Sequence, residues 1–397
     1  MKNRDYYLDQ LKAVKDNGFV KIILGVRRCG KSTLLSLFQI YLMESESVDT
    51  NHIITLNFES FLFDEYKDAK KLHEYVGNKI KDKGHYYLFI DEIQEVDLWA
   101  KAINSLRVTY SIDIYVTGSN SKVFSGEYLT YLSGRYISIN MYPLSFDEFT
   151  TFQDLSNDNE VEYTNFLKSS FPAIVLEKNE NIAQQINIDL FQSIFERDIM
   201  LRGKIRNESA FVKVARFVYE NIGNILSVKS ICDNLKSIGH KIDVEAIDNY
   251  LTLMCKAYCL YQCQRYDIRG KEILKTNGKY YTIDFGLRSG LVPNEDVNTG
   301  KIFENFIYLE LIKKGYSVYV GKVGREYEVD FVAIKNDTKI YVQVSESILD
   351  ENTRFREIRS FELINDKYQK YLVTKQKEIF LFDSCIHLHW IDFIKII

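Results

Sequence analysis

Residues 25–32 read Gly25-Val26-Arg27-Arg28-Cys29-Gly30-Lys31-Ser32, and they follow the short apolar run Phe19–Leu24. Beyond them, apolar residues recur at the spacing of one helix face: Leu34, Leu35, Phe38 and Leu42. The stretch therefore matches G-x-x-x-x-G-K-[ST] between a strand and a helix, the context that this pattern requires. A glycine-rich turn with an incidental lysine is the alternative, and the flanking elements disfavour it. We predict a phosphate-binding loop.

Each residue type in this loop has a chemical reason. Gly25 and Gly30 let the backbone turn so that its N–H groups face phosphate oxygens, and Lys31 brings a positive charge to the β- and γ-phosphates. Ser32 offers a hydroxyl to Mg²⁺, and the helix that it opens points its positive end at the anion. We therefore expect ATP and Mg²⁺ as ligands. The other residues expected to contact the nucleotide are Val26, Arg27, Arg28, Cys29 and Thr33.

An acidic pair follows the apolar run Tyr86–Ile90, which is typical of a buried parallel strand. Asp91 is expected to hold Mg²⁺, directly or through water. Glu92 is expected to orient and deprotonate the water that attacks the γ-phosphate. Two solvated carboxylates at a strand end are the alternative interpretation.

Two more positions are candidates for catalysis. Asn120, with Ser119 beside it, follows the run Ile112–Thr117 and could reach the γ-phosphate from an adjacent strand. A simple turn is the alternative there. Arg135 is a candidate arginine finger that reaches the site of a neighbouring subunit, which would make the protein a homo-oligomer. The alternative is an ordinary surface arginine.

The order of predicted elements divides the chain. Strands alternate with helices up to residue 142, which predicts an α/β fold with a parallel sheet. A mainly helical region follows at 143–205. Two short helices and two strand-like runs, joined by a polar loop at 267–278, predict a winged helix-turn-helix at 206–290. A further α/β domain is predicted at 297–397.

Composition limits the classes of protein. The formal net charge is −4, so a uniformly basic nucleic-acid binder is disfavoured, although a local basic face is compatible with it. The six cysteines form no close-set disulfide framework. The first residues contain no apolar signal segment, and no window approaches about eighteen consecutive apolar residues. We expect a cytoplasmic protein without a membrane span.

Several motifs along nearly the whole chain resemble those of the prokaryotic AAA-type ATPases that carry a C-terminal domain of unknown function. They are GVRRCGKSTLL, LFIDEIQ, VTGSNSKVFS, LSGRY, PLSFDEF, FERDI, YTIDFGLR, FENFIYLEL and EVDFV. The resemblance implies an AAA+ core, a helical lid, a winged helix and a C-terminal fold similar to PD-(D/E)xK nucleases. It places the nucleotide machinery at Lys31, Ser32, Asp91, Glu92, Asn120 and Arg135. It implies no settled substrate.

The C-terminal domain departs from the nuclease pattern. Such nucleases use carboxylates to bind Mg²⁺ and a lysine to help activate water. Here the carboxylates are Glu304 and Asp330, whereas the acidic-x-Lys element reads Gln343-Val344-Ser345. We therefore expect a degenerate binding domain rather than an active nuclease. A lysine from elsewhere could replace the missing one, and the nearby candidates are Lys322, Lys335 and Lys339.

The ribbon of the predicted winged helix is basic. Its cations are Arg265, Arg269, Lys271, Lys275 and Lys279. They suit contacts with the DNA backbone rather than base recognition. The preceding helix carries Glu245 and Asp248, which disfavours a major-groove reader. A solvated wing without DNA is the alternative.

Four hypotheses for function follow. The leading one is an AAA+-type ATPase that couples hydrolysis to conformational change, on DNA or on a DNA-bound partner. The second is a slow ATP-dependent switch or scaffold, and the third is an ATP-powered nuclease. A P-loop small-molecule kinase is the fourth, and the multidomain extension and the Asp91-Glu92 pair disfavour it.

Overall fold

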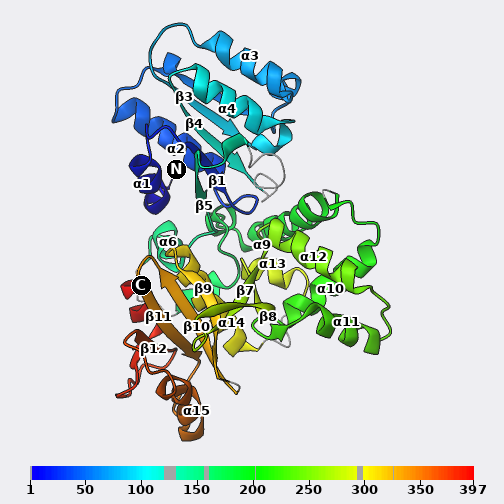
Figure 1. The fold of residues 1–397 in the computed structure, drawn as a ribbon, viewed down its shortest axis with the longest axis vertical. Helices are drawn as coiled ribbons and strands as arrows, with labels where there is room; N and C mark the ends of the chain where they lie inside the picture. Colours follow the sequence, from blue (N-terminus) through cyan, green and yellow to red (C-terminus); the bar gives the residue numbers. More distant parts are fainter. Residues whose placement is uncertain (1, 120–130, 156–160, 202, 293–297, 325) are drawn as a thin grey trace. The chain divides into compact units, whose positions relative to one another are not determined.

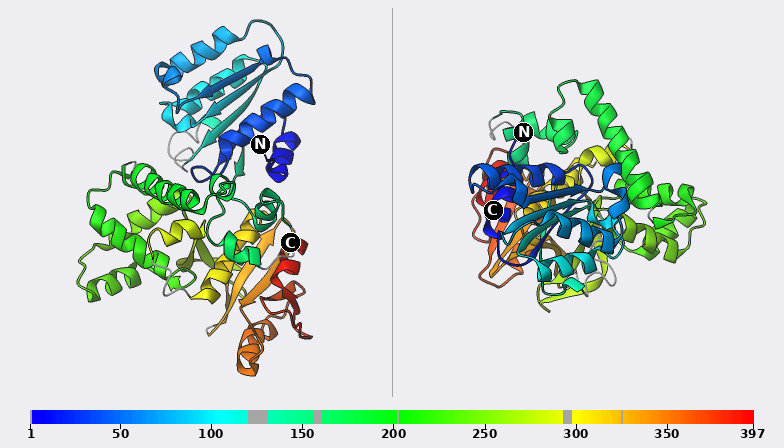
Figure 2. Two further views of the ribbon diagram at one scale, coloured as in Figure 1. Left: turned by 180° about the vertical axis from the view of Figure 1, so that it is seen from behind. Right: turned by 90° about the horizontal axis from the view of Figure 1, so that it is seen from above.

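The structure is a computed structural model that describes residues 2–119, 131–155, 161–201, 203–292, 298–324 and 326–397, without the side chains of residues 275 and 276. Contacts between Cα atoms divide the chain into two compact units (Figures 1 and 2). Unit 1 comprises Met1–Pro143, Phe171–Ala173 and Lys256–Tyr258. Unit 2 comprises Leu144–Ser170, Ile174–Cys255 and Cys259–Ile397.

Unit 1 is built on a five-stranded sheet in the order β2-β3-β4-β1-β5. Its strands are β1 (Val20–Leu24), β2 (Ile53–Asn57), β3 (Tyr86–Asp91), β4 (Ile112–Gly118) and β5 (Tyr136–Asn140). Every neighbouring pair is parallel. The predicted parallel α/β fold is therefore confirmed. Strand β4 lies between β1, which leads into the phosphate-binding loop, and β3, which ends in Asp91.

Helices cover both faces of this sheet (Figure 1). They are α1 (Asp5–Ala13), α2 (Lys31–Glu44), α3 (Ala69–Lys79) and α4 (Trp99–Thr109), with short 3₁₀ turns η1 (Thr50–His52), η2 (Phe61–Tyr66) and η3 (Ile93–Glu95). Alternate strand residues such as Ile22, Leu88 and Ile114 form one core with α3 and α4. On the other face, the ring of Phe38 from α2 lies 5.0 Å from that of Tyr115. Period-2 alternation along the strands thus gives the sheet two apolar faces, one packed on α3 and α4 and the other on α2.

Unit 2 contains an eight-stranded mixed sheet in the order β13-β12-β11-β10-β9-β7-β8-β6. The strands are β6 (Ile225–Leu226), β7 (Leu260–Asp267), β8 (Glu272–Thr282), β9 (Ser317–Val323), β10 (Tyr327–Lys335), β11 (Thr338–Ser345), β12 (Gln369–Thr374) and β13 (Ile386–His389). The antiparallel β7–β8 ribbon joins the later strands through a parallel pairing of β7 with β9. One sheet therefore runs through both the 206–290 and the 297–397 segments.

The helices after residue 143 are mostly short. They are α6 (Phe146–Phe152), α7 (Val161–Phe166), α8 (Pro172–Val175), α9 (Glu180–Ser193), the π-helical η5 (Ile194–Leu201), α10 (Glu208–Glu220), α11 (Val228–Ser237), α12 (Val244–Lys256), α13 (Phe285–Ser289), α14 (Thr299–Lys313), α15 (Glu351–Glu362) and α16 (Trp390–Ile396). Ser145 and Glu148 form a capping box at the start of α6, which fixes where that helix begins. Among the described residues, no helix is long and apolar enough to cross a bilayer.

One expectation about the ribbon is wrong. A polar loop was expected at 267–278, but β8 already begins at Glu272. The polar residues continue as a strand because they pair with the end of β7, and the last three residues of β7 pair in turn with β9. The four proposed domain boundaries stay predictions.

Candidate functional site

The phosphate-binding loop needs glycine at two positions for different reasons. A Cβ on Gly25 would lie 2.0 Å from the carbonyl oxygen of Met141, so no other residue fits there. Gly30 has a φ of 109° and stands immediately before α2, a conformation that L side chains rarely adopt. The loop thus turns sharply out of β1 and directly into a helix.

Lys31 is buried at the first position of α2, and its Nζ lies 3.0 Å from the carbonyl oxygens of both Gly25 and Val26. Ser32 and Thr33 are exposed in the same first turn. The N–H groups of a first helical turn have no acceptor within the helix, and the helix dipole adds positive potential. A cation and these N–H groups together form a setting that suits an anion such as a phosphate.

Strands β3 and β4 bring a polar cluster to the same sheet edge, since the carboxyl ends of parallel strands lie together. Asp91 and Glu92 are both buried. The hydroxyl of Thr117 donates to Asp91 Oδ1 and accepts from the backbone N–H of Glu92 at 3.0 Å. Ser119 Oγ donates to Glu92 Oε2 at 2.9 Å, and Gln94 Nε2 donates to the same oxygen.

Glu92 also has a strained backbone, with a φ of 55°. Such a conformation is uncommon for a residue with a side chain, and it clusters at functional sites. The strain, together with the hydrogen bonds from Ser119 and Gln94, fixes the carboxylate in one direction. The register pairs Leu24 with Gly118, so Ser119 stands next to the start of the phosphate-binding loop.

Some of these residues were anticipated and others were not. Asn120, our first choice for a γ-phosphate contact, lies outside the described residues. Ser119 was named beside it, whereas Thr117 and Gln94 were missed. A signal for Thr117 was available, because a hydroxyl closes the apolar run Ile112–Thr117 at the carboxyl end of a buried strand, where the polar groups of a parallel sheet gather.

Arg135 lies away from the phosphate-binding loop of its own chain. It immediately precedes β5, and its carbonyl accepts from the N–H of Val20 at the start of β1. The loop follows the other end of β1, about 13 Å away at ~3.3 Å per residue. Its exposed side chain donates to Asn104 at 3.4 Å. This position favours either a role in a second subunit or a surface role.

The back of the loop is held by residues that sequence reasoning missed. Buried Arg4 donates through Nη1 to the carbonyls of Cys29 at 2.9 Å and Tyr142 at 2.7 Å. The hydroxyl of Tyr7 accepts from the N–H of Tyr142 at 3.1 Å. Burial raises the pKa of the Cys29 thiol, which donates to the carbonyl of Met141 at 3.4 Å. The loop, the N-terminal segment and residues 141–142 therefore form one hydrogen-bonded group.

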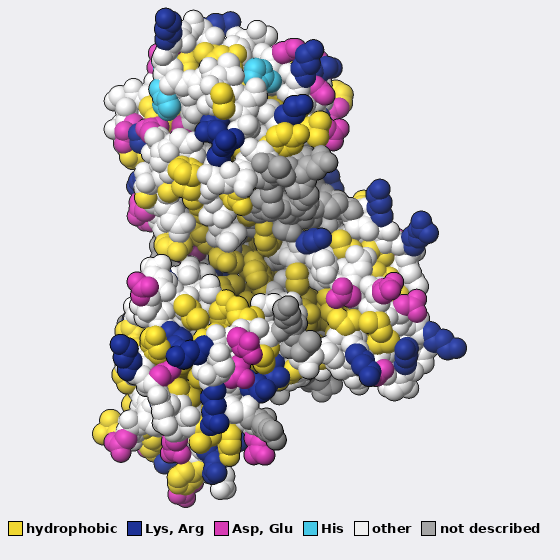
Figure 3. Space-filling model, in the orientation of Figure 1, with side chains coloured by type: hydrophobic (Ala, Val, Ile, Leu, Met, Phe, Trp, Pro, Cys, Tyr) yellow, Lys and Arg dark blue, Asp and Glu magenta, His cyan; other side chains and the backbone are white. Residues whose placement is uncertain are grey.

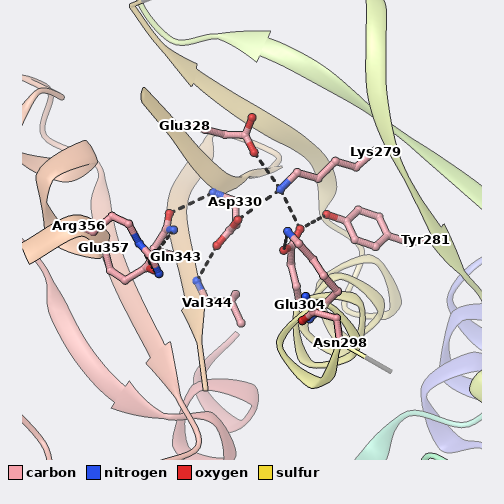
Figure 4. Close-up of polar contacts among 11 residues, drawn as sticks. Lys279, Tyr281, Asn298, Glu304, Glu328, Asp330, Gln343, Val344, Arg356 and Glu357 are labelled. Carbon is pink, nitrogen blue, oxygen red and sulfur yellow. Dashed lines mark hydrogen bonds and ion pairs between the residues drawn. The ribbon is translucent and has the colours of Figure 1, made fainter. Parts of the chain in front are cut away.

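Unit 2 contains a second polar centre, a buried charge cluster between β8, β10 and α14 (Figure 4). Lys279 Nζ lies 2.9 Å from Glu304 Oε1, 2.9 Å from Glu328 Oε1 and 3.4 Å from Asp330 Oδ1. Tyr281 donates to Glu304 at 2.6 Å, and Lys301 Nζ lies 2.7 Å from the other oxygen of Glu304. The structure thus brings the predicted Glu304 and Asp330 together around a lysine that was not expected there.

Gln343 is present in this centre but already has partners. Its Oε1 accepts from the backbone N–H of Asp330 at 3.2 Å, and its Nε2 donates to Glu357 at 2.6 Å. Asp330 Oδ2 accepts from the N–H of Val344 at 2.9 Å. Ser345 Oγ donates to the carbonyl of Ser347 at 3.1 Å. The strand that carries the acidic-x-Lys element in nucleases here holds Asp330 in place.

The basic ribbon needs one correction. Lys279 is buried and ion-paired, so counting it among exposed ribbon cations was wrong. It shares a face of β8 with Tyr281, whose hydroxyl donates to the same oxygen of Glu304. Arg269 and Lys271 are exposed at the turn, Arg265 is half-buried, and the side chain of Lys275 is outside the described set. On the face drawn in Figure 3, the described Lys and Arg side chains are interspersed with Asp and Glu.

Comparison with known proteins agrees with this arrangement. Residues 17–150 match a family model described as an AAA domain, and 163–298 and 299–392 match two domains of unknown function (DUF8612 and DUF4143). An uncharacterized protein of Haemophilus influenzae is 38% identical over 379 residues, covering 94% of this chain and 93% of the relative. The chain belongs to this family of AAA-type P-loop ATPases. A second member, an uncharacterized protein of Methanocaldococcus jannaschii, is 33% identical over 365 residues, which cover 86% of this AAA-type chain and 78% of that protein.

The AAA-type fold also has a similar solved structure. A Walker-type ATPase of Pyrococcus abyssi superposes with a TM-score of 0.51 at 16% identity, covering 73% of this chain and 96% of that one. At this identity the likeness concerns the fold alone. It extends beyond the parallel sheet, since unit 1 is shorter than 73% of the AAA-type chain.

Proposed function

We propose that this protein is a Mg²⁺-dependent ATPase of AAA+ type that couples ATP hydrolysis to conformational change. The observation that carries the proposal is the pairing of Asp91 and Glu92 with Thr117 and Ser119 at the sheet edge where the phosphate-binding loop begins. A loop that only bound a phosphate would not need a buried, strained and doubly hydrogen-bonded glutamate beside it.

The roles follow from position. Residues Gly25 to Thr33 hold the phosphates, Ser32 and Asp91 hold Mg²⁺, and Lys31 stabilises charge on the γ-phosphate. Glu92 accepts the proton of the attacking water, which adds in line with the leaving β-phosphate oxygen. Ser119 orients Glu92 through its hydrogen bond to Oε2, and Asn120, the next residue in the sequence, senses the γ-phosphate. The metal supplies charge neutralisation when bound, in a setting of one hydroxyl and one carboxylate that suits Mg²⁺.

Arg135 acts on the neighbouring subunit, so the active protein is a homo-oligomer. Its place at the opposite strand end from its own loop supports this, because a residue there cannot serve its own site. Burial of the γ-phosphate between two subunits would then make hydrolysis depend on assembly.

Coupling is transmitted through the group around Arg4. The guanidinium of Arg4 donates to the carbonyl of Cys29 in the loop and to the carbonyl of Tyr142. Directly after Tyr142, the chain passes from unit 1 to unit 2 at Pro143-Leu144. A shift of the loop on nucleotide binding would therefore shift the start of the connection. Because packed groups of this kind have discrete arrangements, small shifts are amplified.

DNA, or a partner bound to DNA, is the proposed target. The order α10, β6, α11, α12, β7 and β8 supports a winged helix, and Arg269 and Lys271 at the ribbon turn would contact phosphates. Slow switching without a DNA partner is the second candidate, favoured by the mixed charges of the face in Figure 3.

The test is ATPase activity of the full chain, alone and with single-stranded, duplex and branched DNA. Glu92→Gln should retain ATP binding and lose about 10²–10⁴-fold in turnover. Unchanged turnover would remove Glu92 as the base. If DNA stimulates the ATPase activity and the double variant Arg269→Ala/Lys271→Ala loses this stimulation, the result supports DNA as the target. Absence of any DNA effect leaves the ATPase proposal standing and favours the switch.

A further inference from the structure

We propose that the ammonium of Lys279 is the resident cation of the acidic centre in unit 2, so that this centre binds no divalent metal ion. The centre comprises Glu304 on α14 and Glu328 and Asp330 on β10, with Lys279 reaching it from β8. The inference is independent of the proposed ATPase function.

The geometry of the lysine carries this inference. An ammonium has three N–H donors, and Lys279 Nζ has one oxygen of each of three carboxylates within 2.9, 2.9 and 3.4 Å. A Mg²⁺ ion would need oxygens of these same groups at about 2.0–2.1 Å. The point at which the three carboxylates converge can hold one cation, and the lysine occupies it (Figure 4).

The charges around the lysine are closely balanced. Three carboxylates face Lys279 and Lys301, and Lys279 and Glu304 are almost completely buried. Although burial opposes its charge, Glu304, Asp330 and Glu328 raise the pKa of Lys279 well above its ordinary value. The cluster therefore has its own fixed counter-charge and does not require an added ion to neutralise it.

The remaining oxygen and nitrogen atoms do not offer a replacement site. Gln343 is engaged by Asp330 and Glu357, and the second oxygen of Asp330 is engaged by Val344. In the part of the chain that the structure describes, no group of three or more His, Cys, Asp or Glu side chains is placed to hold a metal ion. The residues present thus do not fit the metal that a nuclease-like domain would use.

The lysine also comes from an unexpected element. Lys335 lies over the ring of Tyr316 at 5.4 Å, and Lys339 lies over that of Tyr368 at 4.3 Å, so these two candidates are engaged elsewhere. Lys279 belongs to the ribbon that precedes the C-terminal segment. The ion pairs of Lys279 therefore also connect the ribbon to α14 and β10.

The test is Mn²⁺ binding to the nucleotide-free full chain, followed by electron paramagnetic resonance. Wild type and Asp330→Asn should bind the same amount of Mn²⁺, because wild type has no Mn²⁺ site that depends on Asp330. Lys279→Ala should gain one Mn²⁺ site per chain, tighter by about tenfold or more than residual binding, because it removes the ammonium that three carboxylates share. Lys301→Ala is the matched control, since it removes a lysine from Glu304 without vacating the central point, and it should gain none.

Two outcomes would overturn the inference. One is an Asp330-dependent Mn²⁺ site in wild type, or plasmid cleavage by wild type that Asp330→Ala abolishes. The other is a Lys279→Ala protein with native circular dichroism that gains no site. If Lys279→Ala does not fold, the comparison of wild type with Asp330→Asn decides alone. A Lys31→Ala background separates this result from the ATPase, because nucleotide chemistry is then absent.

Discussion

Ser119 Oγ lies 2.9 Å from Glu92 Oε2, and this hydrogen bond joins the end of β4 to the end of β3. Gln94 donates to the same oxygen, so the carboxylate is oriented by a hydroxyl and an amide from two different segments. A base that must receive a proton from water benefits from a fixed direction, but Ser119 and Gln94 also occupy lone pairs that could accept that proton. These hydrogen bonds therefore orient Glu92 and at the same time compete with the water for Oε2.

Ser119→Ala tests which effect dominates. We expect turnover to fall by about tenfold, since the loss of a fixed direction for the base costs more than the release of one lone pair gains. ATP affinity should change by less than about threefold, because Ser119 is not assigned to the phosphates. Steady-state ATPase rates and nucleotide binding measure the two quantities. Ser111→Ala is the control, because Ser111 lies just before the opposite end of β4. A faster Ser119→Ala enzyme would show that the hydrogen bond restrains Glu92 instead.

Arg135 and Arg107 both donate to Asn104, and only Arg135 is proposed to act on a neighbouring subunit. Arg135→Ala should lose about 10³-fold in turnover if it is an arginine finger, whereas Arg107→Ala should lose little. Mixing Arg135→Ala with Lys31→Ala should restore part of the activity. In a mixed pair the Lys31→Ala subunit supplies the arginine and its neighbour supplies the intact loop. If the two inactive variants assemble with each other but recover no ATPase activity, this result contradicts action between subunits.

Local sequence was sufficient for the phosphate-binding loop and for four of the five parallel strands. The loop is specified by eight consecutive residues, and β1, β3 and β4 are buried along their whole length, whereas β5, which is half-exposed, was not predicted. The glycine at position 25 is different. The pattern predicts it, but its cause is the carbonyl of Met141, more than a hundred residues later. The reason for a motif residue can thus be non-local even when the motif is local.

Lys279 shows why the second centre could not be derived from sequence. Glu304 and Asp330 were identified because they match the carboxylate positions of the nuclease pattern, and Asp330 also because a carboxylate in an apolar strand is unusual. The same argument applied to Lys279, which precedes the buried residues Tyr280 and Tyr281, but its basic neighbours along the ribbon suggested a surface role. Only the pairing of β7 with β9 brings β8 close to β10 and α14. That pairing spans more than fifty residues and leaves no local signal.

Arg4 should contribute to both stability and nucleotide binding. Arg4→Met removes hydrogen bonds to Cys29 and Tyr142 and leaves one buried and one half-buried carbonyl without this donor. Hydrogen bonds from charged groups are worth about 1.5–3 kcal/mol each, so the loss of two should lower the free energy of unfolding of unit 1 by about 3–6 kcal/mol. ATP affinity should weaken in parallel, because the loop loses its support. Denaturant unfolding and nucleotide titration measure these changes. Lys12→Met, at an exposed i,i+3 pair with Asp9, is the control. If Arg4→Met loses stability but binds ATP with unchanged affinity, Arg4 does not support nucleotide binding by the loop.

The charge cluster predicts a pH dependence of its own. Burial, with the charge of Glu304, raises the pKa of Asp330 from 3.8 to about 7. The folded chain therefore holds this proton more tightly than the unfolded chain. The stabilising contribution of Asp330 is complete below pH 3.8 and is lost as the pH rises through about 7. Asp330→Asn has no such titration, so the stability of wild type relative to this variant should decrease between pH 5 and pH 8. The slope for one proton cannot exceed about 1.4 kcal/mol per pH unit.

The measurement needs a signal from unit 2 alone. Trp99 lies in unit 1 and Trp390 in unit 2, and both are buried. In a Trp99→Phe background, the fluorescence of Trp390 reports the unfolding of unit 2 in denaturant. Asp337→Asn, in the exposed turn between β10 and β11, controls for the removal of a carboxylate. If the stability of wild type relative to Asp330→Asn instead increases with pH, Lys279 favours the charged form of Asp330 more than burial opposes it. The sign of this slope therefore distinguishes two cases at neutral pH. Either Glu304 and Glu328 alone neutralise Lys279, or Asp330 is charged as well and contributes.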